Sequence, residues 1–62
     1  MGKLTLKAAR VNMGLTQIEA AKKLGISTQT LLNYEKGRTS PDVATLKRIE
    51  DLYEVSYREI CF

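Results

Sequence analysis

The stretch "GLTQIEAAKKLGISTQTLLNYEKG", residues 14–37, carries the signals of two short helices joined by a tight turn. Thr16 and Glu19 have the spacing of a capping box, in which each side chain bonds the backbone N–H of the other residue at the start of a helix. Gly25 follows the last apolar residue, at a place where helices commonly end. These signals predict a helix over residues 16–24. Its predicted apolar face consists of Ile18, Ala21 and Leu24.

A second helix is predicted directly after the turn. Ser27 is a favourable N-cap, and Gly37 ends the helix after Lys36. Because at most "GIS" separates the two helices, the chain must turn sharply, and Gly25 can adopt the positive φ that such a turn needs. The small side chain of Ala21 suits a close crossing of the helices. The positions with helix-turn-helix spacing, counted from Gln17, are Ala20, Ala21, Leu24, Gly25, Ile26, Leu31 and Tyr34.

Residues at helical spacing predict two flanking helices. Residues 5–13 form the first, with Gly14 where its C-terminus would be capped. Ser40 and Pro41 are predicted as the N-cap and first turn of the other. The positions at this spacing are Leu6, Ala9, Arg10 and Met13 in the first helix, and Val43, Leu46, Ile49 and Leu52 form the apolar stripe of the other.

A last turn is predicted at Ser56, which repeats the capping box with Glu59 and brings Ile60 to the core. No segment alternates apolar and polar residues as a half-buried strand would, so we expect helices only. A chain of 62 residues has room for one domain. The expected fold class is therefore all-α, a compact bundle in a single domain over residues 1–62.

Composition excludes several kinds of site. With no histidine and one cysteine, Cys61, the chain can form neither a zinc finger nor a Cys–His nucleophile. The apolar neighbours Ile60 and Phe62 favour a small apolar role for Cys61 over a redox switch. Glu50 and Asp51 could suggest acid–base chemistry, but adjacent helix residues point about 100° apart, which favours a solvated face. We expect no enzyme activity, no metal and no cofactor.

Charge is distributed unevenly along the chain. Residues 1–38 hold seven bases and two acids, giving +5, whereas residues 39–62 hold three bases and five acids, giving −2. This polarity suits a module that offers one face to a polyanion, although a random scatter of so few charges often looks similar. No apolar run reaches the roughly 20 residues of a membrane-spanning helix, so we expect a cytoplasmic protein.

The segment "RVNMGLTQIEAAKKLGISTQTLLNYEKGRTSPD", residues 10–42, resembles the phage repressor and Cro family of helix-turn-helix proteins, also called the xenobiotic-response-element (XRE) family. Its most specific pieces are "GLTQ", "GIS" and "YEKGRTSP", and "TLKRIEDLYEVS" is similar to the family's fourth helix and the approach to its fifth. The resemblance implies a lambda-repressor-like fold of four helices plus a short fifth C-terminal helix, with the helix-turn-helix at about residues 16–36. One departure is Ala20, where relatives commonly carry a larger aliphatic residue.

The resemblance also implies that the third helix lies in the major groove of DNA. Its uncharged polar residues are then candidates for reading bases, because Gln and Asn can both donate to and accept from adenine and Thr can offer a methyl group or a hydroxyl. The alternative is a merely solvated face, which usually takes Glu and Lys instead. The expected base-reading residues are Thr28, Gln29, Thr30, Leu32 and Asn33.

Contacts with the DNA backbone are expected from other residues. Gln17 begins the second helix, where free N–H groups favour a phosphate and the family places an equivalent glutamine. Lys36 and Arg38 would hold the strand at the far end of the reading helix. Arg10 and Glu35 match a partly buried ion pair that joins helices one and three in many relatives. The expected phosphate-binding residues are Gln17, Ser27, Lys36 and Arg38, with Lys7, Asn12 and Lys22 as candidates that could equally be plain surface.

Two classes of function stay open at this point. The first is a sequence-specific regulator, a small repressor of phage or mobile-element type that binds double-stranded DNA at a pseudo-palindromic operator. The second is an antitoxin-like or protein-interaction module, or a DNA-binding fragment of a longer regulator. For the first we expect a weak homodimer through the C-terminal region, because Tyr53, Tyr57 and Phe62 exceed what the core needs, although Phe62 could instead close its own core.

Overall fold

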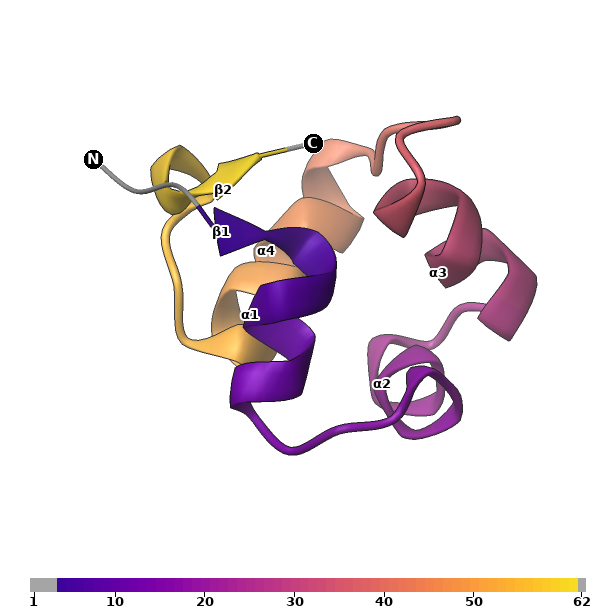
Figure 1. Cartoon of the computed structure of the whole chain (residues 1–62). Helices are drawn as coiled ribbons and strands as arrows, with labels where there is room; N and C mark the ends of the chain where they lie inside the picture. The colour runs from indigo at the N-terminus through magenta and orange to yellow at the C-terminus, as the bar shows by residue number, and fades with distance from the viewer. Residues whose placement is uncertain (1–3, 62) are drawn as a thin grey trace.

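The computed structural model describes residues 4–61, and this part of the chain contains four α-helices and one pair of short strands. Figure 1 shows α1 lying against α4 on one side, with α2 and α3 on the other. No helix in the described range is long and apolar enough to cross a bilayer. In chain order the elements are β1 (Leu4–Thr5), α1 (Leu6–Asn12), α2 (Gln17–Leu24), α3 (Thr28–Glu35), α4 (Val43–Tyr53), the 3₁₀ helix η1 (Tyr57–Glu59) and β2 (Ile60–Cys61).

The turn between α2 and α3 has the predicted chemistry. The Thr16 hydroxyl accepts the Glu19 N–H at 3.1 Å, and the Glu19 carboxylate accepts the Thr16 N–H at 2.9 Å. That backbone hydrogen bond holds the pKa of Glu19 below its ordinary value. Gly25 has φ 73°, and Ser27 caps α3 by accepting the Thr30 N–H at 3.0 Å. Local signals therefore fix both the end of α2 and the start of α3.

Apolar residues from all four helices and from β2 form one core. Burying a Leu or Ile side chain stabilises the fold by about 1.5–3 kcal/mol, so a core of this size depends on each of them. Ala20 has no exposed surface, and its small side chain suits the close packing of α2 at that point. The buried apolar residues are Leu6, Ala9, Ala20, Ala21, Leu24, Leu31, Ile49, Tyr53 and Ile60.

Two apolar residues predicted to face the core are exposed instead. Ile18 is 70% exposed and Val43 is 81% exposed, and each lies in the first turn of its helix. The buried face of α2 consists of Ala20, Ala21 and Leu24, and Ile18 lies to the side of this face. Ile18 and Val43 therefore have helical spacing but lie at the edge of the apolar stripe, where the core does not cover them.

The inward face of α4 is rotated from the predicted stripe. Thr45, Ile49 and Tyr53 are buried at a spacing of four residues, whereas Leu46 and Leu52 are only half-buried. The prediction that Tyr53 exceeds what the core needs is wrong, because it is 2% exposed. Its ring fills the core where α4 ends, and this removes it from the surfaces available to a second copy of the chain.

Helix α4 begins two residues later than predicted. Its N-cap is Asp42 rather than Ser40, because the Asp42 carboxylate accepts the Thr45 N–H at 2.8 Å. Hydrogen bonds from Thr45 lower the pKa of Asp42. Pro41 consequently precedes the helix instead of forming its first turn.

The expectation of helices only is wrong at the two ends of the described chain. β1 and β2 pair in parallel, with Leu4 opposite Ile60 and Thr5 opposite Cys61. Two residues are too few for an alternating pattern to show, and the pairing joins segments more than fifty positions apart, so no local signal could predict it. Cys61 is exposed.

The C-terminal turn follows the prediction in its capping but not in its length. The capping box between Ser56 and Glu59 is present, and Ile60 is buried. It opens a single 3₁₀ turn, Tyr57–Glu59, where a short fifth α-helix was expected. Tyr57 is exposed, and Phe62 lies outside the described residues.

Candidate nucleic-acid interface

Helix α3 brings the five predicted base-reading residues together on one short element. Leu31 has no exposed surface, and half-buried Tyr34 packs against the same core. These two anchors fix which side of α3 faces outward. Of the predicted residues, Thr28 and Gln29 are exposed, whereas Thr30, Leu32 and Asn33 are half-buried.

Hydrogen bonds give Thr30 a different role from Gln29 and Asn33. The hydroxyl of Thr30 bonds the hydroxyl of Ser27 at 2.8 Å, and Ser27 also accepts the Thr30 N–H. Both hydroxyls therefore take part in capping α3. Gln29 Nε2 donates to Asn33 Oδ1 at 3.2 Å, one helical turn away. The amides of Gln29 and Asn33 thus bond each other and no other side chain of the described residues.

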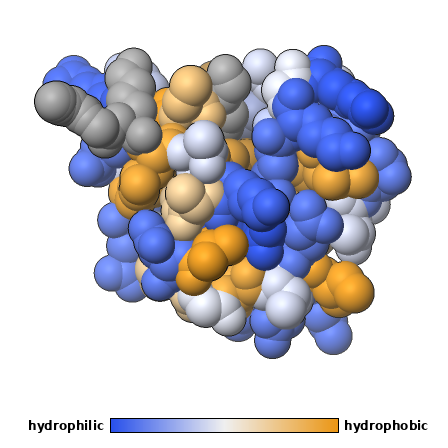
Figure 2. Space-filling view, viewed as in Figure 1, coloured by the Kyte–Doolittle hydropathy of each residue, from blue (hydrophilic) through white to orange (hydrophobic). Residues whose placement is uncertain are grey.

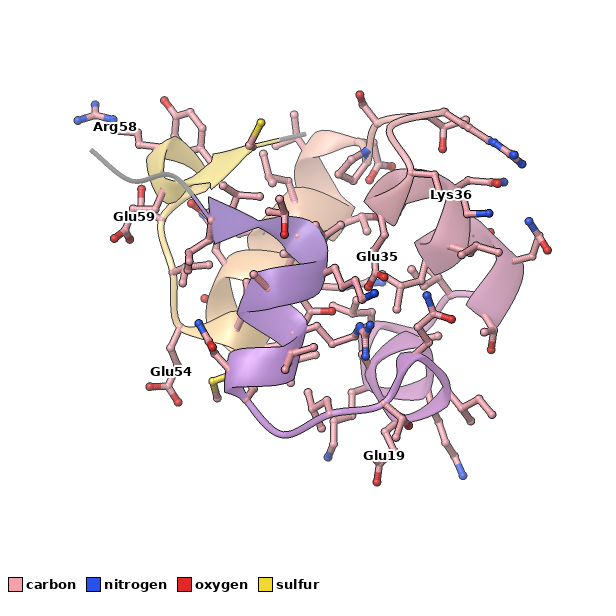
Figure 3. All side chains as sticks on the ribbon, in the orientation of Figure 1. Glu19, Glu35, Lys36, Glu54, Arg58 and Glu59 are labelled. Atoms are coloured by element: carbon pink, nitrogen blue, oxygen red, sulfur yellow. The ribbon has the colours of Figure 1, made fainter. Side chains whose placement is uncertain are left out.

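The inner side of α3 is held by a buried ion pair at Glu35, the last residue of the helix. Arg10 Nε donates to Glu35 Oε2 at 2.7 Å, and the side chains are 8% and 4% exposed. Arg10 also donates to the backbone carbonyl of Leu15 at 2.8 Å. Figure 3 shows Glu35 pointing inward, toward the space between α3, α1 and α2. The ion pair therefore joins α1, α3 and the loop before α2.

Gln17 belongs to the same group of side chains. Its Nε2 donates to Glu35 Oε1 at 3.0 Å, so one carboxylate receives hydrogen bonds from α1 and from α2. Sequence reasoning assigned Gln17 to a phosphate and missed this bond. The two residues are 18 positions apart, and no local spacing rule connects them.

Tyr53 lies close to this ion pair from the side of α4. Burial raises the pKa of Tyr53 to about 12, with the negative charge of Glu35 adding to the effect and Arg10 opposing it. The Tyr53 hydroxyl is buried and has no hydrogen-bond partner within residues 4–61. Each of the three other helices consequently contributes a side chain to the surroundings of Glu35.

Two basic residues follow α3 at its C-terminal end. Lys36 and Arg38 are exposed on either side of Gly37, which has φ 74°. The Arg38 N–H donates to the carbonyl of Asn33 at 2.9 Å, which ties this loop to the helix. In Figure 2 a hydrophilic area covers the upper right of the molecule, where Figure 1 places α3 and the loop after it.

Two acidic residues of the C-terminal half lie away from these bases. Figure 3 places Glu54 and Glu59 far from Lys36, together with the base Arg58. Among the weaker phosphate candidates, Lys7 and Asn12 are exposed on α1 and Lys22 is exposed on α2.

One residue that the sequence did not point to links α4 to the helix-turn-helix. Arg48 Nη1 donates to the carbonyl of Leu24 at 3.5 Å, at the C-terminal end of α2. A cation is favourable at the negative end of a helix dipole. Arg48 lies close to Gly25, so it packs beside the turn itself.

Comparison with known proteins gives several relatives. The HTH-type transcriptional regulator ImmR of Bacillus subtilis is 49% identical over 51 residues, which are 82% of this chain and 40% of ImmR. The uncharacterized HTH-type transcriptional regulator MJ0272 of Methanocaldococcus jannaschii is 38% identical over 55 residues, covering 89% of this chain and 83% of the relative. The cryptic phage CTXphi transcriptional repressor RstR of Vibrio cholerae is 34% identical over 55 residues, covering 89% and 50%.

Coverage differs among these relatives, because the chain spans less than half of ImmR and half of RstR but most of MJ0272. No solved structure matches the chain. Residues 6–60 match the helix-turn-helix family. That match includes both helices of the turn, the ion pair and α4. The chain therefore belongs to the helix-turn-helix family, and its likeness to ImmR and RstR agrees with the XRE type.

Proposed function

We propose that this chain binds a specific sequence in double-stranded DNA and acts as a transcriptional regulator of the repressor type, with α3 in the major groove. The observation that carries the proposal is the outer face of α3, where Thr28, Gln29 and Asn33 offer uncharged hydrogen-bonding groups on a helix fixed to the core. These are the side chains that discriminate base edges. The names of ImmR and RstR, a transcriptional regulator and a repressor, support the same function. The fold proposed is the lambda-repressor-like bundle.

In this proposal, contacts with phosphates surround the reading helix. Lys36 and Arg38 supply positive charge at its C-terminal end, and both are exposed. Gln17 stands at the first residue of α2 and has a second N–H available beyond the one donated to Glu35. Ser27 offers a hydroxyl oxygen already committed to the α3 cap. Lys36 and Arg38 are therefore the main phosphate ligands, and Gln17 and Ser27 contribute secondary contacts.

The experiment that tests this function is selection of bound sequences from a random duplex pool, followed by titration with salt. We expect one enriched sequence, bound at least a thousandfold more tightly than random duplex, the lower end of about 10³–10⁷ for specific binders. Arg38→Ala should weaken specific and random DNA alike and lower the salt slope by about one unit. Recovery of no enriched sequence would overturn the proposal. An unchanged slope would remove Arg38 from the contacts.

We further propose a weak homodimer on a pseudo-palindromic operator, because one short reading helix has a small footprint and relatives of this type bind half-sites about 34 Å apart. Of the predicted interface residues, Tyr57 is 53% exposed and stays available, whereas Tyr53 is buried. Sedimentation with a palindromic duplex tests this: we expect two chains per duplex at saturation. A Tyr57→Ala variant should lower this ratio, and one chain per duplex for the unchanged protein would exclude the dimer.

A further inference from the structure

The hydrogen bond between Gln29 and Asn33 changes what each side chain can offer to DNA. Gln29 Nε2 donates to Asn33 Oδ1 at 3.2 Å along the outer side of α3. Residues four apart on a helix are neighbours, and Gln to Asn bonds at this spacing stabilise the pair of rotamers. The two amides are therefore oriented relative to each other before DNA binds.

Counting donors and acceptors gives the groups that remain. A carboxamide has two N–H groups and an oxygen with two lone pairs. In a bidentate contact with adenine, the oxygen accepts from N6 while the N–H on the same side donates to N7. The other N–H of Gln29 is not needed for that contact. Gln29 can therefore read adenine while it holds Asn33.

Asn33 is affected in the opposite way. Its Oδ1 is turned along the helix toward Gln29. The oxygen is thereby held toward Gln29 and uses one of its two lone pairs there, so the group that the side chain offers to DNA is Nδ2 with its two N–H donors. Donors bond acceptors, so this group suits O6 and N7 of guanine or O4 of thymine better than adenine, whose acceptor N7 stands beside the N6 donor. An unpaired asparagine would instead bond adenine through both atoms.

We propose that Gln29 and Asn33 read DNA as one hydrogen-bonded unit, in which Gln29 selects adenine and orients Asn33 to select guanine or thymine at a neighbouring base pair. The inference rests on the proposed function, because it assigns a base preference to the same helix. No other pair of side chains on α3 shares this arrangement within the described residues, since Thr30 bonds Ser27, which precedes the helix.

The test replaces one partner and reads the base preference of the other. Gln29→Met removes the amide and keeps the length of an exposed side chain that the core does not use. Site selection with this variant should lose adenine at one position. At the position read by Asn33, the preference should move from guanine or thymine to adenine. The control is Thr28→Val, an exposed neighbour outside the pair, which should alter one position only.

A double-mutant cycle adds a quantitative readout. Gln29→Met and Asn33→Ala should each weaken binding to the selected duplex by about 5- to 150-fold, which corresponds to the loss of one good base contact. If the residues act as a unit, the combined loss should be smaller than the product of the single losses by about twofold or more. Independent readers would give the simple product.

The outcomes separate this inference from the proposed function. If Gln29→Met changes only its own base position and the losses multiply, the pairing is wrong and α3 still reads DNA. If neither variant changes the selected sequence, α3 does not read bases, and both proposals fail. In the free protein, the Gln29 side-chain amide should show a hydrogen-bonded N–H by NMR that Asn33→Ala abolishes and Thr28→Val preserves. Its absence in the unchanged protein would overturn the pairing.

Discussion

The two sides of α3 treat polar side chains in opposite ways. On the inner side, the Glu35 carboxylate is 4% exposed and accepts hydrogen bonds from Arg10 and Gln17, which lie on two other helices. On the outer side, Gln29 and Asn33 bond only each other among the described side chains. Buried charges are costly unless fully paired, so the inner side orients the helix. The outer side leaves donors and acceptors for a ligand.

Removing the ion pair on the inner side of α3 should have the largest effect on stability. Glu35→Ala leaves the Arg10 guanidinium in a nearly buried position with the Leu15 carbonyl as its main remaining partner. Removal of one partner of a buried ion pair costs about 3–5 kcal/mol. We expect a loss of this size in the free energy of unfolding, measured by urea denaturation. In a domain of 62 residues this consumes much of the total stability.

A double variant provides the control for this prediction. Arg10→Met combined with Glu35→Leu replaces both charges with apolar side chains, which is often neutral or stabilising. We expect it to recover most of the stability lost in Glu35→Ala. If Glu35→Ala lowers the free energy of unfolding by less than about 1 kcal/mol, the value expected of an exposed pair, then the ion pair does not anchor α3.

Substitutions on the outer side of α3 should weaken DNA binding without lowering stability. Gln29→Ala or Asn33→Ala should cost about 1–3 kcal/mol of binding free energy on the selected duplex. The free energy of unfolding should stay within about 0.5 kcal/mol, as for most surface substitutions. Lys47→Ala, an exposed change on α4, should alter neither quantity. A stability loss matching the binding loss would show that these residues support the helix instead of reading DNA.

Gln17 combines a bond to the inner side of α3 with a position where a phosphate could bind, and its variant sharpens the comparison. It bonds the buried carboxylate of Glu35, yet it also stands at the N-terminus of α2. Gln17→Ala should lower the free energy of unfolding by about 1–2 kcal/mol, because hydrogen bonds to charged groups are worth about 1.5–3 and Arg10 still compensates Glu35. Gln17→Glu should cost more, since two carboxylates would then repel. A loss of DNA affinity without any loss of stability would assign Gln17 to the phosphates alone.

The sequence predicted those parts of the fold that depend on neighbouring residues. Thr16 and Glu19 begin α2, Gly25 turns the chain, and Ser27 caps α3, all as local capping rules require. The recognition of the XRE type rested on "GLTQ", "GIS" and "YEKGRTSP", which include Thr16, Gly25 and Ser27, and is confirmed by the family match. Such signals lie within a few positions of one another, so the sequence alone is sufficient to find them.

Several features that depend on distant residues were missed, although the ion pair of Arg10 and Glu35 was expected from the resemblance to the XRE family and is present. The bond from Gln17 to Glu35 and the pairing of β1 with β2 join segments that only the folded chain brings together. The burial of Tyr53 was missed because several apolar residues of α4 competed for one inward face, and tertiary packing selected among them. The roles of the outer residues of α3 toward bases stay predictions, since they depend on a partner.

The smallest effect concerns Tyr53, whose hydroxyl lies near the inner side of α3 and has no hydrogen-bond partner in the described residues. Burial raises the pKa of Tyr53 from 10.0 to about 12, so the folded chain keeps the phenol neutral while the unfolded chain ionises. The stability from this difference is present below pH 10 and is lost as the pH rises toward 12. Tyr53→Phe should abolish this part of the alkaline loss. It should also raise the free energy of unfolding at pH 7 by about 0.5–1 kcal/mol, because a buried unsatisfied hydroxyl is removed. Urea denaturation at several pH values, compared with the unchanged chain, measures both effects. If Tyr53→Phe is less stable at pH 7, the hydroxyl takes part in the hydrogen bonding around Glu35, and the hydrogen-bonded group on the inner side of α3 includes Tyr53 besides Arg10, Gln17 and Glu35.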